Sequence, residues 1–157
     1  MNDNYPQGWV RDDEAVEAVQ ATLEYPVAGE TPAGQVEDIP DHVYLWDVAR
    51  AVNGSLLPPR NQGQVGSCVS FGTARAVEYS MCAEIAVGEP EAFLDLCTEV
   101  IYAGSRVEIG GGRLRGDGSV GAWAADWCRK YGILGRLEYK TEKATYDLRQ
   151  YSESRCK

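Results

Sequence analysis

The chain has 157 residues, 44% of them apolar, which allows one sizeable core and leaves too little for two full domains. Its 24 acidic and 15 basic residues give a net charge of -9, so the surface repels phosphate backbones and nucleic acid is not an expected partner. The acidic first twenty residues exclude a secretory signal, and no apolar run approaches the ~20 residues of a membrane helix. We therefore expect one cytoplasmic domain without membrane association.

The N-terminal region, residues 1–40, combines acidic residues with several prolines and glycines. One short helix is predicted over Asp12–Leu23, because Val16, Val19 and Leu23 give it a thin apolar stripe. Two interpretations stay open: an arm that packs on another surface, such as a partner, or a largely disordered leader.

The next predicted elements surround a run of turn-forming residues at Pro58–Gly66. Before this run, Asp41–Val52 has a periodicity that fits either a helix or a strand. After it, Ser67 suits an N-cap, and a helix is predicted from Cys68 to about Glu84. Its predicted core face consists of Phe71, Ala74, Val77, Met81 and Ile85.

Three further segments follow. A helix is predicted over Glu91–Arg106, and Gly110–Gly118 is a flexible loop. The clearest helix of the sequence begins after Ser119 as its cap and ends at Gly132, with Trp123, Trp127 and Tyr131 in its apolar stripe. A last amphipathic segment, Thr141–Cys156, places Ala144, Leu148 and Tyr151 on one side.

The five cysteines are an odd number and contain no Cys-x-x-Cys pair, which favours neither a zinc site nor a disulfide framework. No metal or cofactor is expected, and a reducing cytosol is the simplest compartment. Cys82, Cys97 and Cys128 fall on predicted apolar faces and are expected in the core, whereas Cys156 lies near the exposed end.

Cys68 is the candidate nucleophile, because it is predicted at the N-terminus of a helix, where the helix dipole favours a thiolate. Attack on an amide carbonyl also requires hydrogen-bond donors for the oxyanion. From position alone, these donors are the side chain of Gln64 and the backbone N–H of Cys68, which faces the open first turn.

The segment NQGQVGSCVSFGTARAVEY, residues 61–79, resembles the nucleophile segment of papain-like cysteine peptidases. In that family the oxyanion glutamine precedes the glycine of Asn-Gln-Gly, so the resemblance gives this role to Gln62 and makes Gln64 the runner-up. The residues that match the family are Asn61, Gln62, Gly63, Gly66, Ser67, Cys68 and Phe71.

A second segment is similar to the same family. Asp117-Gly118-Ser119, then a Trp-bearing helix and Tyr131-Gly132-Ile133, resembles its Asn-Gly-Gly, helix and Tyr-Gly-Ile. The resemblance implies that Gly118 and Ser119 line the substrate cleft together with Gly66 and Ser67. The two matches cover roughly residues 41–140.

The chain departs from the family pattern at several positions. Val65 stands in place of a disulfide cysteine, as in an intracellular or phage-type relative, Val69 in place of a tryptophan, and Ser119 in place of the second cleft glycine. The base that such a peptidase needs is a downstream histidine, whereas the one histidine of this sequence, His42, lies upstream of Cys68.

The resemblance implies a helix-rich α+β fold in which residues 41–157 form the left, helical half of a papain-like protein, without its β-rich right half. Two functions follow. The chain is the nucleophile-bearing half of a cysteine peptidase, completed by a histidine from elsewhere, with a peptide or protein as substrate. Alternatively, it is an inactive scaffold with a structural or interaction role, for example in a phage particle. In either case another protein chain is expected to cover the exposed cleft face.

Overall fold

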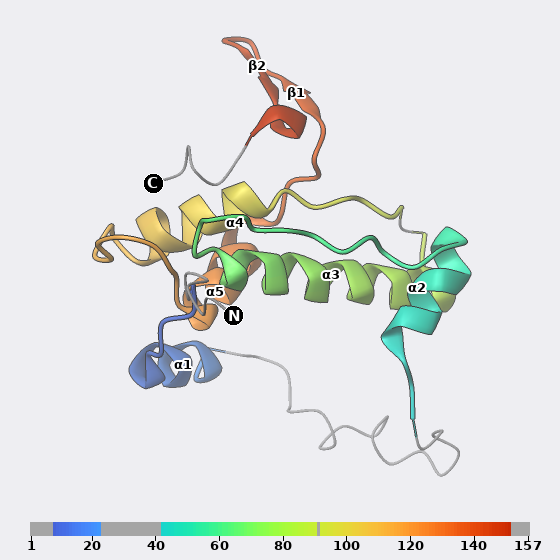
Figure 1. Ribbon diagram of the computed structural model, residues 1–157, viewed down its shortest axis with the longest axis horizontal. Helices are drawn as coiled ribbons and strands as arrows, with labels where there is room; N and C mark the ends of the chain where they lie inside the picture. The colour runs from blue at the N-terminus through green and yellow to red at the C-terminus, as the bar shows by residue number, and fades with distance from the viewer. Residues whose placement is uncertain (1–7, 23–41, 91, 152–157) are drawn as a thin grey trace.

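The computed structural model of the protein describes residues 8–22, 42–90 and 92–151 (Figure 1). Within these ranges the fold is helix-rich with one small two-stranded sheet, which confirms a mixed α+β domain at this level. No helix in these ranges has the length and apolar content needed to cross a membrane. The α-helices are α1 (Asp13–Gln20), α2 (Leu45–Asn53), α3 (Cys68–Ala86), α4 (Thr98–Gly104) and α5 (Gly121–Tyr131).

Helix α3 is the longest element, about 28 Å at the usual rise per residue, and the predicted helix from Cys68 is confirmed. Its core face differs from the predicted one. The residues that point most deeply inward recur every four positions and include polar ones: Ser70, Ala74, Glu78 and Cys82. Of the predicted apolar face Ala74 is buried, Val77 and Met81 are partly buried against the same core, and Phe71 and Ile85 are half-buried. Apolar and small residues lie all round the helix, so apolar spacing alone does not determine which side is deepest.

Helix α5 packs on α4 and on the π-helix η2 (Ser105–Ile109), which continues α4. Two glycines make this close approach possible: a Cβ at Gly104 would overlap the Trp127 indole, and one at Gly110 would lie 2.7 Å from a ring carbon of Trp123. Val120, not Ser119, is the N-cap of α5. The predicted Ser119 cap is wrong because its backbone bonds to the N-terminal segment and its hydroxyl lies 2.7 Å from that of Ser105.

Helix α1 confirms the short predicted N-terminal helix, although it ends at Gln20, and Leu23 lies outside the described residues. The Asp12 side chain caps it by accepting a hydrogen bond of 2.9 Å from the Ala15 N–H. The helix packs against α5, as Figure 1 shows in blue and orange. The rest of the predicted N-terminal region, residues 23–40, is also outside the described residues.

Helix α2 resolves the ambiguous Asp41–Val52 segment in favour of a helix that ends at Gly54, whose positive φ of 72° suits a C-cap. It packs on the C-terminal part of α3, where the Asn53 side-chain amide lies 3.3 Å from the Cys82 sulfur.

One predicted element is confirmed in part and another is wrong. The helix predicted over Glu91–Arg106 is confirmed from Thr98 onward as α4 and its continuation η2. Residues 92–97 are extended, because their backbone groups pair elsewhere: Cys97 donates to the Leu134 carbonyl and Arg136 to that of Asp95. Of the predicted amphipathic segment Thr141–Cys156, residues 152–156 lie outside the described residues. The part up to Tyr151 is not one-sided, since Ala144 and Tyr151 are exposed and Leu148 is buried. Residues 138–150 instead form an antiparallel hairpin of β1 (Glu138–Lys140) and β2 (Thr145–Asp147), followed by the 3₁₀ helix η3 (Leu148–Gln150).

A buried carboxylate on α3 joins three segments. The Glu78 side chain is 1% exposed, and it pairs with Arg60 on the extended segment before α3 and with Arg75 one turn earlier, at 3.1 Å. It also accepts a hydrogen bond of 2.9 Å from the Leu96 N–H. Arg60 in turn bonds to the Leu96 carbonyl and to Asp95. The Oε1 atom takes the bonds of Arg60 and Leu96, whereas Oε2 is buried with the Arg75 ion pair and no hydrogen bond, so the loss of hydration is offset mainly at Oε1.

We predict that Glu78→Ala destabilises the fold by roughly 3 kcal/mol, because it leaves Arg60 and the Leu96 N–H without their buried partner. Urea denaturation at pH 7 measures the change. Glu84→Ala, an exposed position on the same helix, is the matched control and is expected to change stability by less than about 0.5 kcal/mol. Equal effects of the two substitutions would contradict this role.

Candidate functional site

The candidate nucleophile, Cys68, is the first residue of α3, and its side chain is exposed. Ser67 occupies the N-cap position without a side-chain capping bond, since its hydroxyl donates to the Val65 carbonyl at 3.5 Å. Its own carbonyl accepts from the Ser70 hydroxyl at 2.8 Å. The first N–H groups of a helix have no intrahelical acceptor, so the Cys68 N–H is at the open end of α3. A thiol and a backbone donor are therefore presented side by side.

The loop that leads into Cys68 is shaped by its own polar groups. The Asn61 side chain accepts a hydrogen bond of 2.8 Å from the Gly63 N–H, and Gly63 has a positive φ of 62°. The Gln62 carbonyl accepts from the Val65 N–H at 3.4 Å. Gln62 is half-buried and Gln64 is exposed, so the two candidate amides differ in their surroundings.

A second loop, residues 114–119, lies against the first. The Asp117 carboxylate accepts a hydrogen bond of 3.0 Å from the Gly66 N–H, which links the two loops across 51 positions of sequence. Gly66, Ser67, Gly118 and Ser119, the four predicted cleft residues, are all buried. The structure therefore brings both predicted cleft segments together at the start of α3.

Arg106 is a site residue that the sequence did not reveal. Its buried guanidinium donates to the carbonyls of Gly116 and Gly118 and lies 5.0 Å from the centre of the Tyr102 ring. The Tyr102 hydroxyl in turn accepts from the Gly118 N–H at 3.2 Å. The π-helix η2 carries Arg106, and such an element is not readable from apolar spacing. These bonds hold the second loop in place.

His42 is at a different place in the fold. It precedes α2, and Figure 1 shows α2 at the end of α3 opposite to Cys68. The contact of Asn53 with Cys82 places the end of α2 about 21 Å along the α3 axis from Cys68. The His42 ring stacks with that of Tyr44, with the ring centroids 6.2 Å apart.

The other described cysteines are unlike Cys68. Cys82 and Cys97 are buried, and Cys128 is half-buried against the core. Burial raises the pKa of Cys97 and that of Cys128 from about 9 to about 11. Both therefore remain thiols at neutral pH, as expected for core residues.

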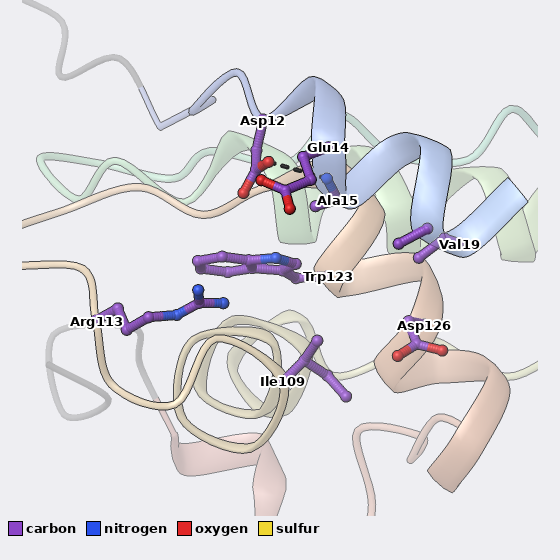
Figure 2. Close-up of a pocket in the computed structure, with 9 residues that line it drawn as sticks. Asp12, Glu14, Ala15, Val19, Ile109, Arg113, Trp123 and Asp126 are labelled. Carbon is purple, nitrogen blue, oxygen red and sulfur yellow. Dashed lines mark hydrogen bonds between the residues drawn. The ribbon is translucent and has the colours of Figure 1, made fainter.

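A hollow of about 320 Å³ lies between α1, η2 and α5, beside the site rather than in it. Figure 2 shows the Trp123 indole in this hollow, with the cap residue Asp12 and Glu14 of α1 on one side and the Arg113 guanidinium on the other, 4.9 Å from the ring centre. Within the described ranges no three His, Cys, Asp or Glu side chains are grouped to hold a metal ion.

Comparison of the chain with protein-family models, with curated proteins and with solved structures gives no match.

We predict that Arg106→Lys loosens the second loop, because an ammonium cannot reproduce the forked bonds of the guanidinium. Subtilisin is expected to cut residues 110–118 about tenfold faster in this variant, since local opening limits cleavage. Arg115→Lys, an exposed change in the same loop, is the control and should leave the rate unchanged. Equal cleavage of both variants would show that Arg106 does not hold the loop.

Proposed function

We propose that this chain is the nucleophile-bearing half of a papain-like cysteine peptidase, which hydrolyses peptide bonds once a histidine from another segment or chain completes the site. The observation that carries the proposal is the exposed Cys68 thiol at the first residue of α3, next to two loops that are linked by Asp117.

The proposed chemistry has two steps. The Cys68 thiolate attacks the carbonyl carbon, a C–S bond forms, the C–N bond breaks, and the imidazolium of the supplied histidine protonates the leaving amine. Water then attacks the acyl-thioester and releases the acid and the thiol. In both steps the carbonyl oxygen becomes an oxyanion, which the Gln62 side chain and the Cys68 N–H stabilise.

A second function is favoured by the apolar surface of the helical part. Val107 and Leu134 are exposed and line a groove of about 370 Å³ with Trp127 and Val100. Val43, Leu45 and Trp46, at the start of α2, are exposed as well. Apolar surface of this kind suits contact with another protein, as in an inactive structural component of a phage particle.

The effect of replacing Gln62 on the acylation rate of Cys68 separates these two functions. The full chain is incubated with p-nitrophenyl acetate, and the acyl adduct on Cys68 is followed by mass spectrometry. Gln62→Ala is expected to slow acylation at least tenfold. Removing one oxyanion donor from a complete enzyme slows the reaction by ~10²–10³, and the effect here is smaller because the base is missing. Cys68→Ser should remove the adduct.

Gln64→Ala, the same change two residues away, is the matched control and is expected to leave acylation unchanged. If Gln64→Ala slows the reaction instead, the oxyanion role belongs to Gln64. If neither change has an effect and Cys68 reacts no faster than free cysteine, the peptidase proposal is wrong and the structural function is favoured.

A further inference from the structure

The groove between the two loops is filled by the chain's own N-terminal segment, Gly8–Val10. The Gly8 carbonyl accepts a hydrogen bond of 2.8 Å from the Ser119 N–H, and the Val10 N–H donates one of 2.9 Å to the Ser119 carbonyl. Trp9 and Ser119 thus form a parallel β-bridge. The segment binds as an added strand, in which backbone bonds supply affinity and side chains supply selectivity.

Gly8 lies where a side chain cannot fit. A Cβ at this position would overlap the Gly66 carbonyl and lie 2.8 Å from the Cys68 nitrogen. Both neighbours are backbone atoms next to the start of α3, so they cannot move aside as the end of a side chain can. The groove therefore accepts only glycine against the Cys68 amide.

The third residue of the segment, Val10, also contacts the groove with its side chain, whereas the second, Trp9, is largely exposed. The Val10 γ2 carbon approaches Gly118 so closely that a Cβ there would lie 3.2 Å from it. Gly118 has a positive φ of 100°, which allows it to present bare backbone to this side chain. Trp9 is 61% exposed, and its indole nitrogen lies near Gly121, where an added Cβ would be 4.0 Å from it. The loops around Cys68 thus constrain Gly8 and Val10 more closely than Trp9.

Helix α1 keeps the segment in the groove. Only Arg11 and the cap Asp12 separate Val10 from α1, and α1 packs on α5. Tethering at such short range gives a ligand a high effective concentration, so even a weakly bound segment occupies its site.

We propose that this groove is a binding site for extended peptides that place glycine against the Cys68 amide and a β-branched residue two positions later, and that Gly8–Val10 is its internal occupant. The inference names the substrate class of the site described under Proposed function and rests on that proposal for the role of Cys68. Because Gly8 lies against the Cys68 N–H, the segment and a reacting carbonyl compete for the same place. Acylation of Cys68 is therefore expected to be faster in Gly8→Ala than in the wild-type chain, and the comparison of Gln62→Ala with Gln64→Ala is repeated in the Gly8→Ala background.

The test begins with Gly8→Ala in the full chain. The added methyl group should expel the segment, so that hydrogen exchange of the Val10 and Ser119 amides becomes at least about tenfold faster. Gly72→Ala is the matched control: Gly72 is exposed on α3, and nothing lies within 4 Å of its added Cβ. This control should leave both amides protected. Retained protection of Ser119 in Gly8→Ala would overturn the inference.

The second step supplies the occupant as a separate molecule. A synthetic peptide of sequence QGWVRD is titrated into ¹⁵N-labelled Gly8→Ala protein, and saturable shifts are expected at Cys68 and Ser119. The peptide QAWVRD should produce none, and the wild-type chain should bind neither because its groove is filled. Equal binding of the glycine and alanine peptides would contradict the proposed selectivity.

If Gly8→Ala does not fold, Val10→Ala replaces it, because this change removes the contact with Gly118 and adds no atoms to the groove. The peptide experiment is separate from the acylation of Cys68. Glycine-selective binding without Gln62-dependent acylation retains the peptide site and rejects the peptidase. Gln62-dependent acylation with equal binding of both peptides retains the peptidase proposal and rejects the glycine-selective peptide site.

Discussion

The buried carboxylate of Glu78 is the interaction on which the arrangement around Cys68 depends. A charge in the core is tolerated only where ionic and hydrogen-bonding partners replace its hydration, and here Arg60, Arg75 and the Leu96 N–H do so. Arg60 directly precedes the Asn61–Gln62 loop. Satisfying one charge in α3 thus fixes where this loop begins, and Cys68 lies at its other end.

The opposite side of the site depends on Arg106. Its guanidinium holds the second loop through the carbonyls of Gly116 and Gly118, and Asp117 of this loop bonds back to Gly66. Two loops far apart in the sequence therefore share one groove, and both supply bare glycine backbone to it. The N-terminal segment pairs with this backbone as a strand would, and it lies against Gly66, Gly118 and Ser119, three of the four buried residues that were predicted to line the cleft.

Local signals predicted most of the helices. Ser67 before an apolar run predicted the start of α3, and Gly132 predicted the end of α5. Long-range pairing was not predictable: Leu96 bonds to Glu78 and bridges Gly135, which keeps residues 92–97 extended despite their helical spacing. Glu78 itself reads as a solvated residue, because nothing near it in the sequence reveals that Arg60 will meet it in the core.

The candidate site was predictable only in part, for the same reason. A motif of residues close in sequence indicated Cys68 and the Gln62 loop, and a second motif indicated Gly118 and Ser119. Arg106 was missed because its role depends on carbonyls eight to twelve residues away that carry no side-chain signal. The role of Gly8 requires the folded groove to be known.

The reactivity of the individual cysteines in the full chain tests most directly whether α3 presents Cys68 as a nucleophile. Iodoacetamide labelling, resolved by peptide mass spectrometry between pH 6 and about 11, gives one rate per thiol. At pH 7 Cys68 should react first and faster than free cysteine, whereas Cys97 and Cys128 should react only as the pH approaches about 11, where burial has moved their pKa. A Cys68 rate no greater than that of Cys128 or of free cysteine at pH 7 would contradict the account.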